Sequence, residues 1–232
     1  MRDIQSNYGN TAQIFIDLWG PLLDHEKELI LRNIDTRHYH KNDYLYRIGE
    51  RPMYVMYVLK GRVKIFRNSD DGRPKIIRIF RENQFFAYRA FFAQDLYTTD
   101  CIAMEDTRVV TFPVNVIGRL VDGNKTVMKY FFKQLAKGLG MSDDRIVSMA
   151  QKHLRGRLAE TLLFLAHSFG TDKENWINGK ITRSDIANLA NMTTSNAIRT
   201  MTAFRDEGII DTDGKKIRIS KPDKLVYISG KE

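Results

Sequence analysis

The stretch that most constrains this chain is residues 181–210, ITRSDIANLANMTTSNAIRTMTAFRDEGII. Ile186, Leu189 and Ala190 are spaced like the apolar face of a short helix. Asn191 then interrupts the pattern, and Asn tolerates the left-handed backbone that a tight corner often needs. The pattern predicts a short helix followed by an abrupt turn.

Capping signals mark the starts of two helices in this stretch. Thr182 and Asp185 have the spacing of a capping box, with Asp in the place of Glu. Beyond the turn, either Thr193 or Thr194 can cap a second helix. The stretch therefore predicts two short helices joined by a tight turn.

The second helix divides into an apolar face and a polar face. Ala197, Ile198, Met201 and Phe204 supply the stripe that is expected to be buried. The other face carries short hydrogen-bonding groups and one Arg, namely Thr194, Ser195, Asn196 and Arg199. A helix of this kind is shaped to enter the major groove of double-stranded DNA. The alternative is an ordinary helical hairpin within a protein core.

The neighbouring segments favour the DNA interpretation. Residues 151–170 have an amphipathic pattern that ends at Gly170, and the polar residues 171–179 are expected to form a loop. Residues 211–220, DTDGKKIRIS, predict a β-hairpin that turns at Asp213-Gly214. A helix-turn-helix followed by such a hairpin is a winged helix, whose cations are placed to meet DNA phosphates. These cations are Lys215, Lys216 and Arg218, and the formal net charge of +9 also suits a polyanionic partner.

The first half of the chain is predicted to be rich in short strands. Residues 11–34 have helical apolar spacing that Gly20-Pro21 interrupts, and the character of the sequence changes after them. The runs rich in β-formers are 43–47, 54–59, 62–67, 75–80 and 107–112, with turn signals at Gly49-Glu50, Lys60-Gly61 and Asp71-Gly72. This spacing predicts a sandwich or barrel of about the size of a jelly roll.

A long helix is predicted from about residue 124 to residue 149. Its apolar positions are Val127, Met128, Phe131, Phe132, Leu135, Leu139 and Ile146. So long a stripe is more than one closed β domain requires, which favours a helix packed against its two-fold mate in a homodimer. The alternative is a helix buried within its own chain. Gly138 and Gly140 mark either a close approach of helices or a bend.

Several classes of protein are not expected. The chain has no apolar run of the roughly 18 residues that a membrane span needs, and MRDIQSNYGN at its start lacks the apolar core of a signal peptide. Cys101 is the single cysteine, which excludes an intramolecular disulfide and a cysteine-ligated cluster, and a cytoplasmic protein is expected. No nucleophile–base pair, metal-ligand spacing or phosphate loop points to an enzyme. His38 and His40 are interpreted as surface polar residues, so no metal site is predicted.

Two motifs resemble the CRP/FNR family of bacterial transcription regulators. GRLAETLL at 156–163 resembles the helix that opens the family's DNA domain, and ITRSDIA at 181–187 matches the start of its helix-turn-helix. Weaker support comes from Gly49-Glu50 and from LKGRV at 59–63, which fall where the family's β-roll turns. The resemblance covers roughly residues 15–220, and the order of its pieces is more specific than any one of them.

The resemblance implies roles for residues of the winged helix. Thr194, Ser195, Asn196 and Arg199 would occupy the base-reading face, with Arg199 as the best candidate for a bidentate contact to guanine. Phosphate contacts would come from Thr182, Arg183, Ser184, Thr193, Lys215, Lys216 and Arg218. The family commonly has Glu at the position of Ser195 and often Arg or Val at that of Thr194, so the familiar operator sequence is not expected here.

The β-roll lacks the charged anchors that the family's nucleotide-binding members use. Their Gly-Glu-Leu and Arg-Ser-Ala motifs fall on residues 87–89, AYR, and 97–99, YTT. A buried phosphate without its cation is costly, so weak or absent cyclic AMP binding is expected. Arg89 could supply a displaced cation, and Ser142 lies where the family offers a hydroxyl to adenine. The candidate effector-pocket residues are Tyr88, Arg89, Tyr97, Thr98 and Ser142.

The same region is rich in aromatic residues, and no cofactor is identified from it. These aromatic residues are expected to fill the place of the family's nucleotide pocket, and the alternative is that they line an apolar ligand or haem site. They are Phe85, Phe86, Tyr88, Phe91, Phe92 and Tyr97. Cys101 is expected to be an inert core thiol.

Together these features predict an α+β protein of three parts. They are a jelly-roll-like β-roll with N-terminal helices at residues 1–122, a dimerisation helix at 123–150 and a winged helix-turn-helix at 151–232. The expected function is that of a homodimeric transcription regulator that binds specific DNA sequences, senses a small-molecule effector and acts with RNA polymerase. The alternative is a ligand-sensing module for a cyclic nucleotide or haem, with weak or vestigial DNA binding.

Overall fold

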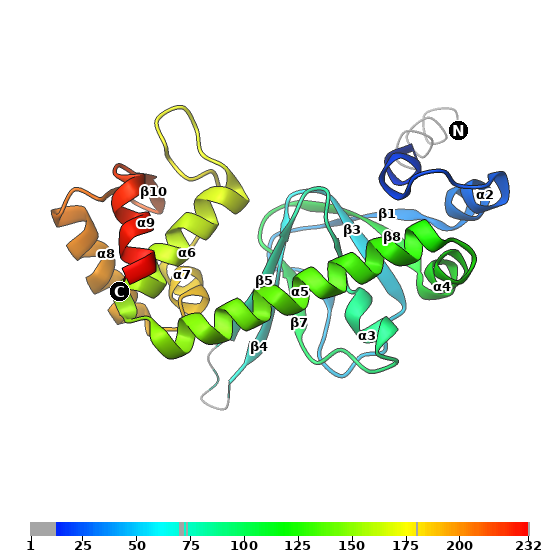
Figure 1. Cartoon of the computed structure of the whole chain (residues 1–232), viewed down its shortest axis with the longest axis horizontal. Helices are drawn as coiled ribbons and strands as arrows, with labels where there is room; N and C mark the ends of the chain where they lie inside the picture. The colour runs from blue at the N-terminus through cyan, green and yellow to red at the C-terminus, as the bar shows by residue number, and fades with distance from the viewer. Residues whose placement is uncertain (1–12, 70–71, 73, 180, 232) are drawn as a thin grey trace. The chain divides into compact units, whose positions relative to one another are not determined.

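The computed structural model describes residues 13–69, 72, 74–179 and 181–231, which form two compact units (Figure 1). The first unit holds the described residues of Met1–Ile65 and Ile79–Gly140, and the second those of Phe66–Arg78 and Met141–Glu232. The segment MRDIQSNYGN, the first two residues of the 11–34 helical pattern and Asp71 lie outside the described residues. Within the described residues, no helix is both long and apolar enough to cross a membrane.

Among the described residues, eight strands form two four-stranded sheets. The first sheet has the order β1-β8-β3-β6 and the second the order β2-β7-β4-β5. Their bounds are β1 Asp35–Tyr39, β2 Tyr44–Tyr46, β3 Tyr54–Lys60, β4 Arg62–Asn68, β5 Pro74–Arg81, β6 Phe85–Phe86, β7 Asp100–Ala103 and β8 Thr107–Pro113. All five strands expected from the sequence are confirmed, whereas β1, β6 and β7 were not predicted.

The strands β3, β6 and β8 of the first sheet are largely buried. Along β3, Met56 and Val58 belong to the core between the two sheets, while Val55 and Tyr57 belong to a second core on the opposite face. Successive side chains of a strand point to opposite faces, so the continuous apolar run of β3 serves both cores. This sheet therefore separates the interior of the β-roll from a layer of helices.

Helices from three parts of the chain build the second core. Residues 13–19 and α2 (Asp24–Asn33) are helical on either side of Gly20, whose φ of +81° allows the reversal, so the interruption predicted at Gly20-Pro21 is confirmed. α3 (Tyr88–Phe92), α4 (Val114–Gly123) and the beginning of α5 (Lys125–Gln151) complete the layer. Trp19 and Phe131 are fully buried in it.

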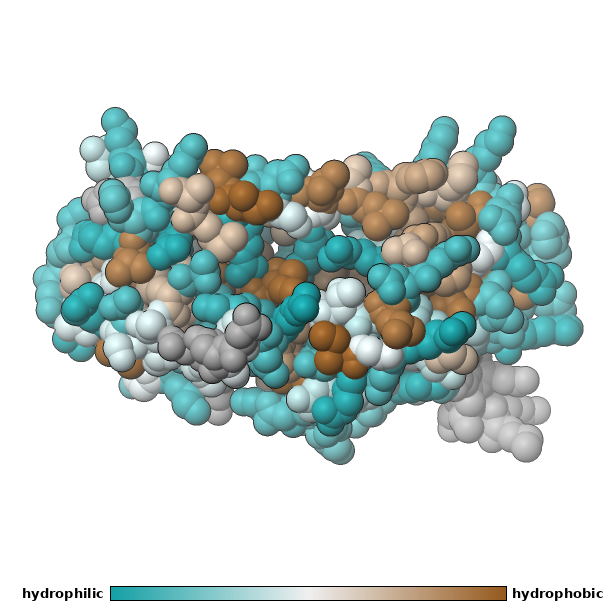
Figure 2. All heavy atoms as spheres, turned by 90° about the horizontal axis from the view of Figure 1, so that it is seen from below, coloured by the Kyte–Doolittle hydropathy of each residue, from teal (hydrophilic) through white to brown (hydrophobic). Residues whose placement is uncertain are grey.

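The long helix α5 runs unbroken for 27 residues and is drawn in green in Figure 1. The helix continues through Gly138 and Gly140. Only its first half packs into the core described above, through Val127 and Phe131. Further along, large apolar side chains are exposed on the single chain: Phe132, Leu139, Met141, Ile146, Val147 and Met149. Figure 2 shows hydrophobic patches among hydrophilic side chains on the face that it draws.

The remainder of the second unit is a small helical domain with a two-stranded wing. It contains α6 (Leu154–Phe169), α7 (Arg183–Leu189), α8 (Thr194–Asp206), β9 (Ile210–Asp213), β10 (Lys216–Ile219) and α9 (Pro222–Lys231). The wing was predicted to turn at Asp213-Gly214, but Asp213 pairs with Lys216, so the two-residue loop is Gly214-Lys215. Gly214 has a φ of +54°, which suits the first central position of a hairpin turn. The helix α9 was not predicted and packs against α6.

Candidate nucleic-acid interface

Side-chain caps fix the starts of α7 and α8. The Thr182 Oγ1 accepts a hydrogen bond from the backbone N–H of Asp185 at 3.0 Å and donates to that residue's carboxylate at 2.7 Å. The Thr193 Oγ1 accepts from the backbone N–H of Asn196 at 3.2 Å, so Thr193, not Thr194, is the cap. Asn191 has a φ of +50° at the corner between the two helices, as predicted. Both helix starts are therefore fixed by local hydrogen bonds.

The exposed face of α8 carries the predicted base-reading residues. Thr194, Ser195 and Arg199 are exposed, and Asn196 is half-buried. The Arg199 Nη2 donates to the Asn196 Oδ1 at 3.0 Å, so these two side chains lie together on the helix surface. This face combines hydroxyl, amide and guanidinium groups, which are the kinds of group that read base edges.

Ile198 is the one residue of the predicted apolar stripe that is not buried. Its side chain is 48% exposed, whereas Ala197, Met201 and Phe204 are buried. Ile198 follows Ser195 by three residues on α8, so it lies on the exposed polar face. Sequence reasoning placed Ile198 in the core only because it is apolar. An exposed apolar side chain at this position is suited to contact the methyl group of a thymine.

Arg183 connects α7 to the turn of the wing. Its Nη2 donates to the carbonyl oxygen of Gly214 at 2.9 Å, while its Nη1 is buried without a hydrogen-bond partner among the described residues. Burial lowers the pKa of Arg183 below its ordinary value. Ser184, the next residue, is exposed on α7. A buried guanidinium N–H without an acceptor is unfavourable and is satisfied when an acceptor binds.

The cations of the wing differ in their surroundings. Lys215 and Lys216 are exposed, whereas the Arg218 guanidinium donates to one Asp211 carboxylate oxygen at 3.1 and 2.7 Å. Hydrogen bonds from Ser220 and Arg218 lower the pKa of Asp211, which keeps this ion pair formed. Arg218 also lies over the ring of Trp176, 5.2 Å from its centroid.

The segment 171–179, which was predicted to be a polar loop, forms backbone hydrogen bonds with the wing. The backbone N–H of Ile177 donates to Ile217, and that of Ile219 donates to Asn175. Trp176 forms an isolated β-bridge with Arg218. This pairing was not predicted, because it depends on residues about 40 positions further along the chain.

Ion pairs attach the ends of α5 and α8 to α6. Ser148 of α5 and Lys152, the residue after its end, both contact the carboxylate of Glu160 on α6, the lysine at 3.3 Å. Arg155 at the start of α6 forms a two-fold hydrogen bond with Glu207, at 2.8 and 3.0 Å, just beyond α8. The hydrogen bond from Arg155 lowers the pKa of Glu207. α6 is therefore joined both to the end of α5 and to the end of α8.

Comparison with known protein families gives one match in each half of the chain. Residues 36–124 match the cyclic nucleotide-binding domain, and residues 156–228 match the Crp-like helix-turn-helix domain. The chain belongs to the CRP/FNR family of transcription regulators. The α+β fold and the family resemblance inferred from the sequence are thereby confirmed. The members of the CRP/FNR family are transcription regulators, not enzymes.

Individual relatives are distant but similar in length. The CRP-like cAMP-activated global transcriptional regulator of Mycobacterium tuberculosis is 23% identical over 179 residues, 76% of this chain and 80% of that protein. The cAMP-activated global transcriptional regulator CRP of Pasteurella multocida is 23% identical over 199 residues, 85% and 95% of the two chains. The solved structure of FixK2 from Bradyrhizobium japonicum has a TM-score of 0.76 at 19% identity, covering 84% of this chain and 96% of that one.

In the CRP/FNR β-roll of this chain, two tyrosines occupy the interior. The rings of Tyr46 and Tyr97 are stacked with centroids 3.8 Å apart, and the Tyr97 hydroxyl donates to the carbonyl of Tyr54 at 3.4 Å. Burial raises the pKa of both tyrosines well above the ordinary value, so both stay neutral.

Within the first unit, the candidate pocket residues are divided between two cores and the surface. Tyr97 lies in the core between the sheets, whereas Tyr88 packs in the helix-side core, with its ring 5.7 Å from that of Phe131. Arg89 and Thr98 are exposed, and Ser142 is on α5 in the second unit. The aromatic cluster is divided in the same way. Phe86 and Tyr97 fill the roll, while Phe85, Tyr88, Phe91 and Phe92 pack against the helices.

Cys101 is fully buried in the roll interior. Burial raises the pKa of its thiol well above the ordinary value, so the reactive thiolate is disfavoured. This surrounding is that of a structural thiol, in agreement with the interpretation made from the sequence.

Proposed function

We propose that this regulator is a homodimer that inserts two α8 helices into successive major grooves of an imperfectly palindromic DNA site. The observation that carries the proposal is the exposed face of α8, which presents Ser195, Ile198 and Arg199. This helix is capped at Thr193 and is followed by the wing. In such dimers the half-site centres are about 34 Å apart. Protection of a genomic site of this symmetry in a footprinting experiment tests the proposal.

A seven-residue repeat along α5 supports the two-fold partner. Starting at Met128, positions four and three residues apart in alternation form a single seam: Met128, Phe132, Leu135, Leu139, Ser142, Ile146 and Met149. This is the a/d spacing of a two-stranded coiled coil. In the single chain Phe132, Leu139 and Ile146 are each more than 60% exposed, and a second copy of the helix would cover them. Ser142 is the one polar member, and a polar seam residue fixes the register of two paired helices.

Phosphate contacts are proposed for the basic residues around α7 and the wing. The Nη1 of Arg183 is the strongest candidate, because it is buried without an acceptor and a phosphate oxygen would supply one. Lys215 and Lys216 are exposed at the wing, and Ser184 is exposed on α7. Thr182 and Thr193 already use their hydroxyl oxygens as caps, so their contribution would be to hold the helix starts. Arg218 would act while remaining paired with Asp211.

Arg199→Ala is expected to weaken binding to the specific site by about 1–3 kcal/mol and to relax the preference at one base pair. The reason is that the guanidinium would form two hydrogen bonds with guanine, which Ala cannot form. Fluorescence-anisotropy titrations with the footprinted site and its single-base variants measure the effect. An unchanged base preference in Arg199→Ala would contradict the proposed role.

Lys216→Ala is the contrasting variant. Removal of the Lys216 ammonium group is expected to weaken binding to all DNA sequences alike. It should also reduce the slope of log K against log salt concentration by about 1, because one phosphate contact is removed. Arg199→Ala should change the preference among sequences, and Lys216→Ala should not. If both variants behaved alike, the division into base-reading and phosphate-contacting residues would be wrong.

We further propose that the effector is not cyclic AMP, although the relatives named above are cAMP-activated. The roll interior is occupied by Tyr46, Phe86 and Tyr97, and Arg89, the one cation among the candidate pocket residues, is exposed. A calorimetric titration with cyclic AMP is expected to give no binding in the micromolar range, because the phosphate lacks a buried cation. Micromolar binding that Arg89→Ala abolishes and Arg51→Ala retains would instead assign Arg89 as a displaced phosphate ligand.

The remaining parts of the proposal concern the setting in the cell. We place the regulator in the cytoplasm, where it would act on transcription together with RNA polymerase and without catalytic activity of its own. Native mass spectrometry of the purified protein, searching for a retained small molecule, would identify an effector. Tight binding of haem or a nucleotide combined with no protected DNA site would favour a sensing module instead.

A further inference from the structure

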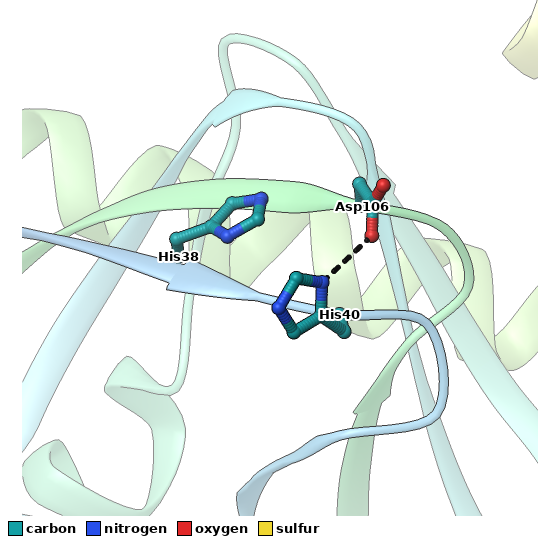
Figure 3. A group of neighbouring side chains, drawn as sticks. All are labelled: His38, His40 and Asp106. Carbon is teal, nitrogen blue, oxygen red and sulfur yellow. Dashed lines mark hydrogen bonds and ion pairs between the residues drawn. The ribbon is translucent and has the colours of Figure 1, made fainter.

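Two histidines and one aspartate gather on the surface of the β-roll, far from α8 in the sequence (Figure 3). His38, His40 and Asp106 each present a ligand atom, and these three atoms lie within 4.8 Å of one another. The Nδ1 of His40 is 3.2 Å from a carboxylate oxygen of Asp106, and the rings of His38 and His40 have centroids 4.8 Å apart. All three residues are exposed, so solvent ions reach them directly.

The strand pairing explains why these residues meet. His38 lies on β1, and His40 follows the end of that strand, so the two side chains share one face of the sheet. β1 pairs with β8 in the register His38↔Arg108 and Tyr39↔Thr107, which brings the turn before β8 beside His40. Asp106 is in that turn, 66 residues from His40.

Hydrogen bonds hold the backbone on both sides of the cluster. The N–H of His40 donates to the Asp43 carboxylate at 2.8 Å, and the N–H of Asn42 donates to the carbonyl of Ala103 at 2.8 Å. On the other side, the Thr107 hydroxyl donates to the carbonyl of Glu105 at 2.8 Å. The ligands are therefore carried by two ordered turns, and their side chains need only rotate to close on an ion.

We propose that His38, His40 and Asp106 bind a divalent transition-metal ion of the zinc type. Two neutral imidazoles and one carboxylate are a preferred donor set for Zn²⁺, and three protein ligands leave a fourth position for water. Magnesium and calcium prefer oxygen donors, so a set with two nitrogens selects against both. The hydrogen bond between His40 and Asp106 orients the donors before the ion arrives. This site is independent of the proposed DNA contacts.

A bound ion would join the end of β1 to the turn between β7 and β8. The buried thiol of Cys101 is not a competing ligand for an ion at the surface. Arg108, the cross-strand partner of His38, brings a positive charge to the same face of the sheet. The proposal therefore predicts that Arg108→Ala strengthens metal binding, the opposite of the effect of removing a ligand.

The test is a competition titration of Zn²⁺ between the full-length protein and a chromophoric chelator, with Mg²⁺ as the ion that should not bind. We expect one Zn²⁺ per chain. His38→Ala, His40→Ala and Asp106→Asn should each weaken binding by at least the roughly 10–100-fold that loss of an outer-shell partner costs in other sites. His25→Ala and His153→Ala remove equally exposed histidines elsewhere and should leave the affinity unchanged.

A second measurement distinguishes a lost ligand from lost structure. Circular dichroism should show the same fold for all variants, because the three side chains are exposed and take no part in a core. Zn²⁺ should raise the melting temperature of the parent protein and not that of His40→Ala. The proposal is overturned if no Zn²⁺ binds in competition, or if the three ligand variants bind Zn²⁺ as tightly as His25→Ala and His153→Ala do.

Discussion

Leu139→Glu is expected to convert the protein to monomers and to weaken its binding to a two-half-site operator by about 10²–10⁴-fold, the factor that linking two binding modules typically contributes. Leu139 occupies the middle of the proposed α5 seam and is 65% exposed in the single chain. In a two-fold dimer the substitution would bury two carboxylates close to each other, which is strongly unfavourable. Analytical ultracentrifugation measures the mass, and anisotropy measures the DNA affinity.

Lys137→Glu is the matched control for this experiment. Lys137 lies two residues before Leu139 on the same helix and is exposed. It changes the net charge by more than Leu139→Glu does, yet it should leave the dimer intact because it faces away from the seam. If Leu139→Glu remained a dimer, or if Lys137→Glu dissociated it to the same extent, the assignment of the seam would be wrong.

Gly61→Ala is expected to lower the free energy of unfolding by about 2–6 kcal/mol, which combines backbone strain of about 1–3 kcal/mol with overpacking of about 1–3 kcal/mol. Gly61 joins β3 to β4 with a φ of +90°. A Cβ at this position would lie 2.6 Å from the Thr107 hydroxyl oxygen and 2.8 Å from the carbonyl oxygen of Asp106. The backbone oxygen cannot move without disturbing the start of β8.

Gly49→Ala separates the two contributions. Gly49 has a similar φ of +85°, but no atom of the described residues lies within 4 Å of a Cβ built there. It should therefore show only the cost of the left-handed backbone, and the difference between the variants measures the clash. Urea unfolding followed by circular dichroism gives both values. Equal losses in the two variants would contradict a close approach between Gly61 and the turn at Asp106.

The elements that were predicted correctly are those with strong local signals. The capped starts of α7 and α8, the Asn191 corner and the apolar strand β3 each follow from a few adjacent residues. In contrast, the sequence of β1, DTRHY, has no alternating apolar pattern, and β6 is only two residues long. These strands form because they pair with β8 and β3, which is a contact between distant parts of the chain.

The candidate sites show the same limit. An apolar residue such as Ile198 can face the core or the solvent, and the periodicity of a short helix did not distinguish the two. From the sequence, His38 and His40 were interpreted as surface polar residues, and Asp106 could not be placed beside them before the register of β1 with β8 was known. The aromatic residues before Tyr97 were assigned to one pocket because β6 and α3, which divide them between two cores, are too short to recognise.

The contacts of Glu160 have a mechanical consequence for signalling. Because Ser148 in the last turn of α5 and Lys152 just beyond it both contact that carboxylate, the end of α5 is linked to α6 across the break at His153. Arg155 couples α6 in turn to Glu207 at the end of α8. A rotation of the last turn of α5 would thus be transmitted through these contacts to α6 and to the end of α8.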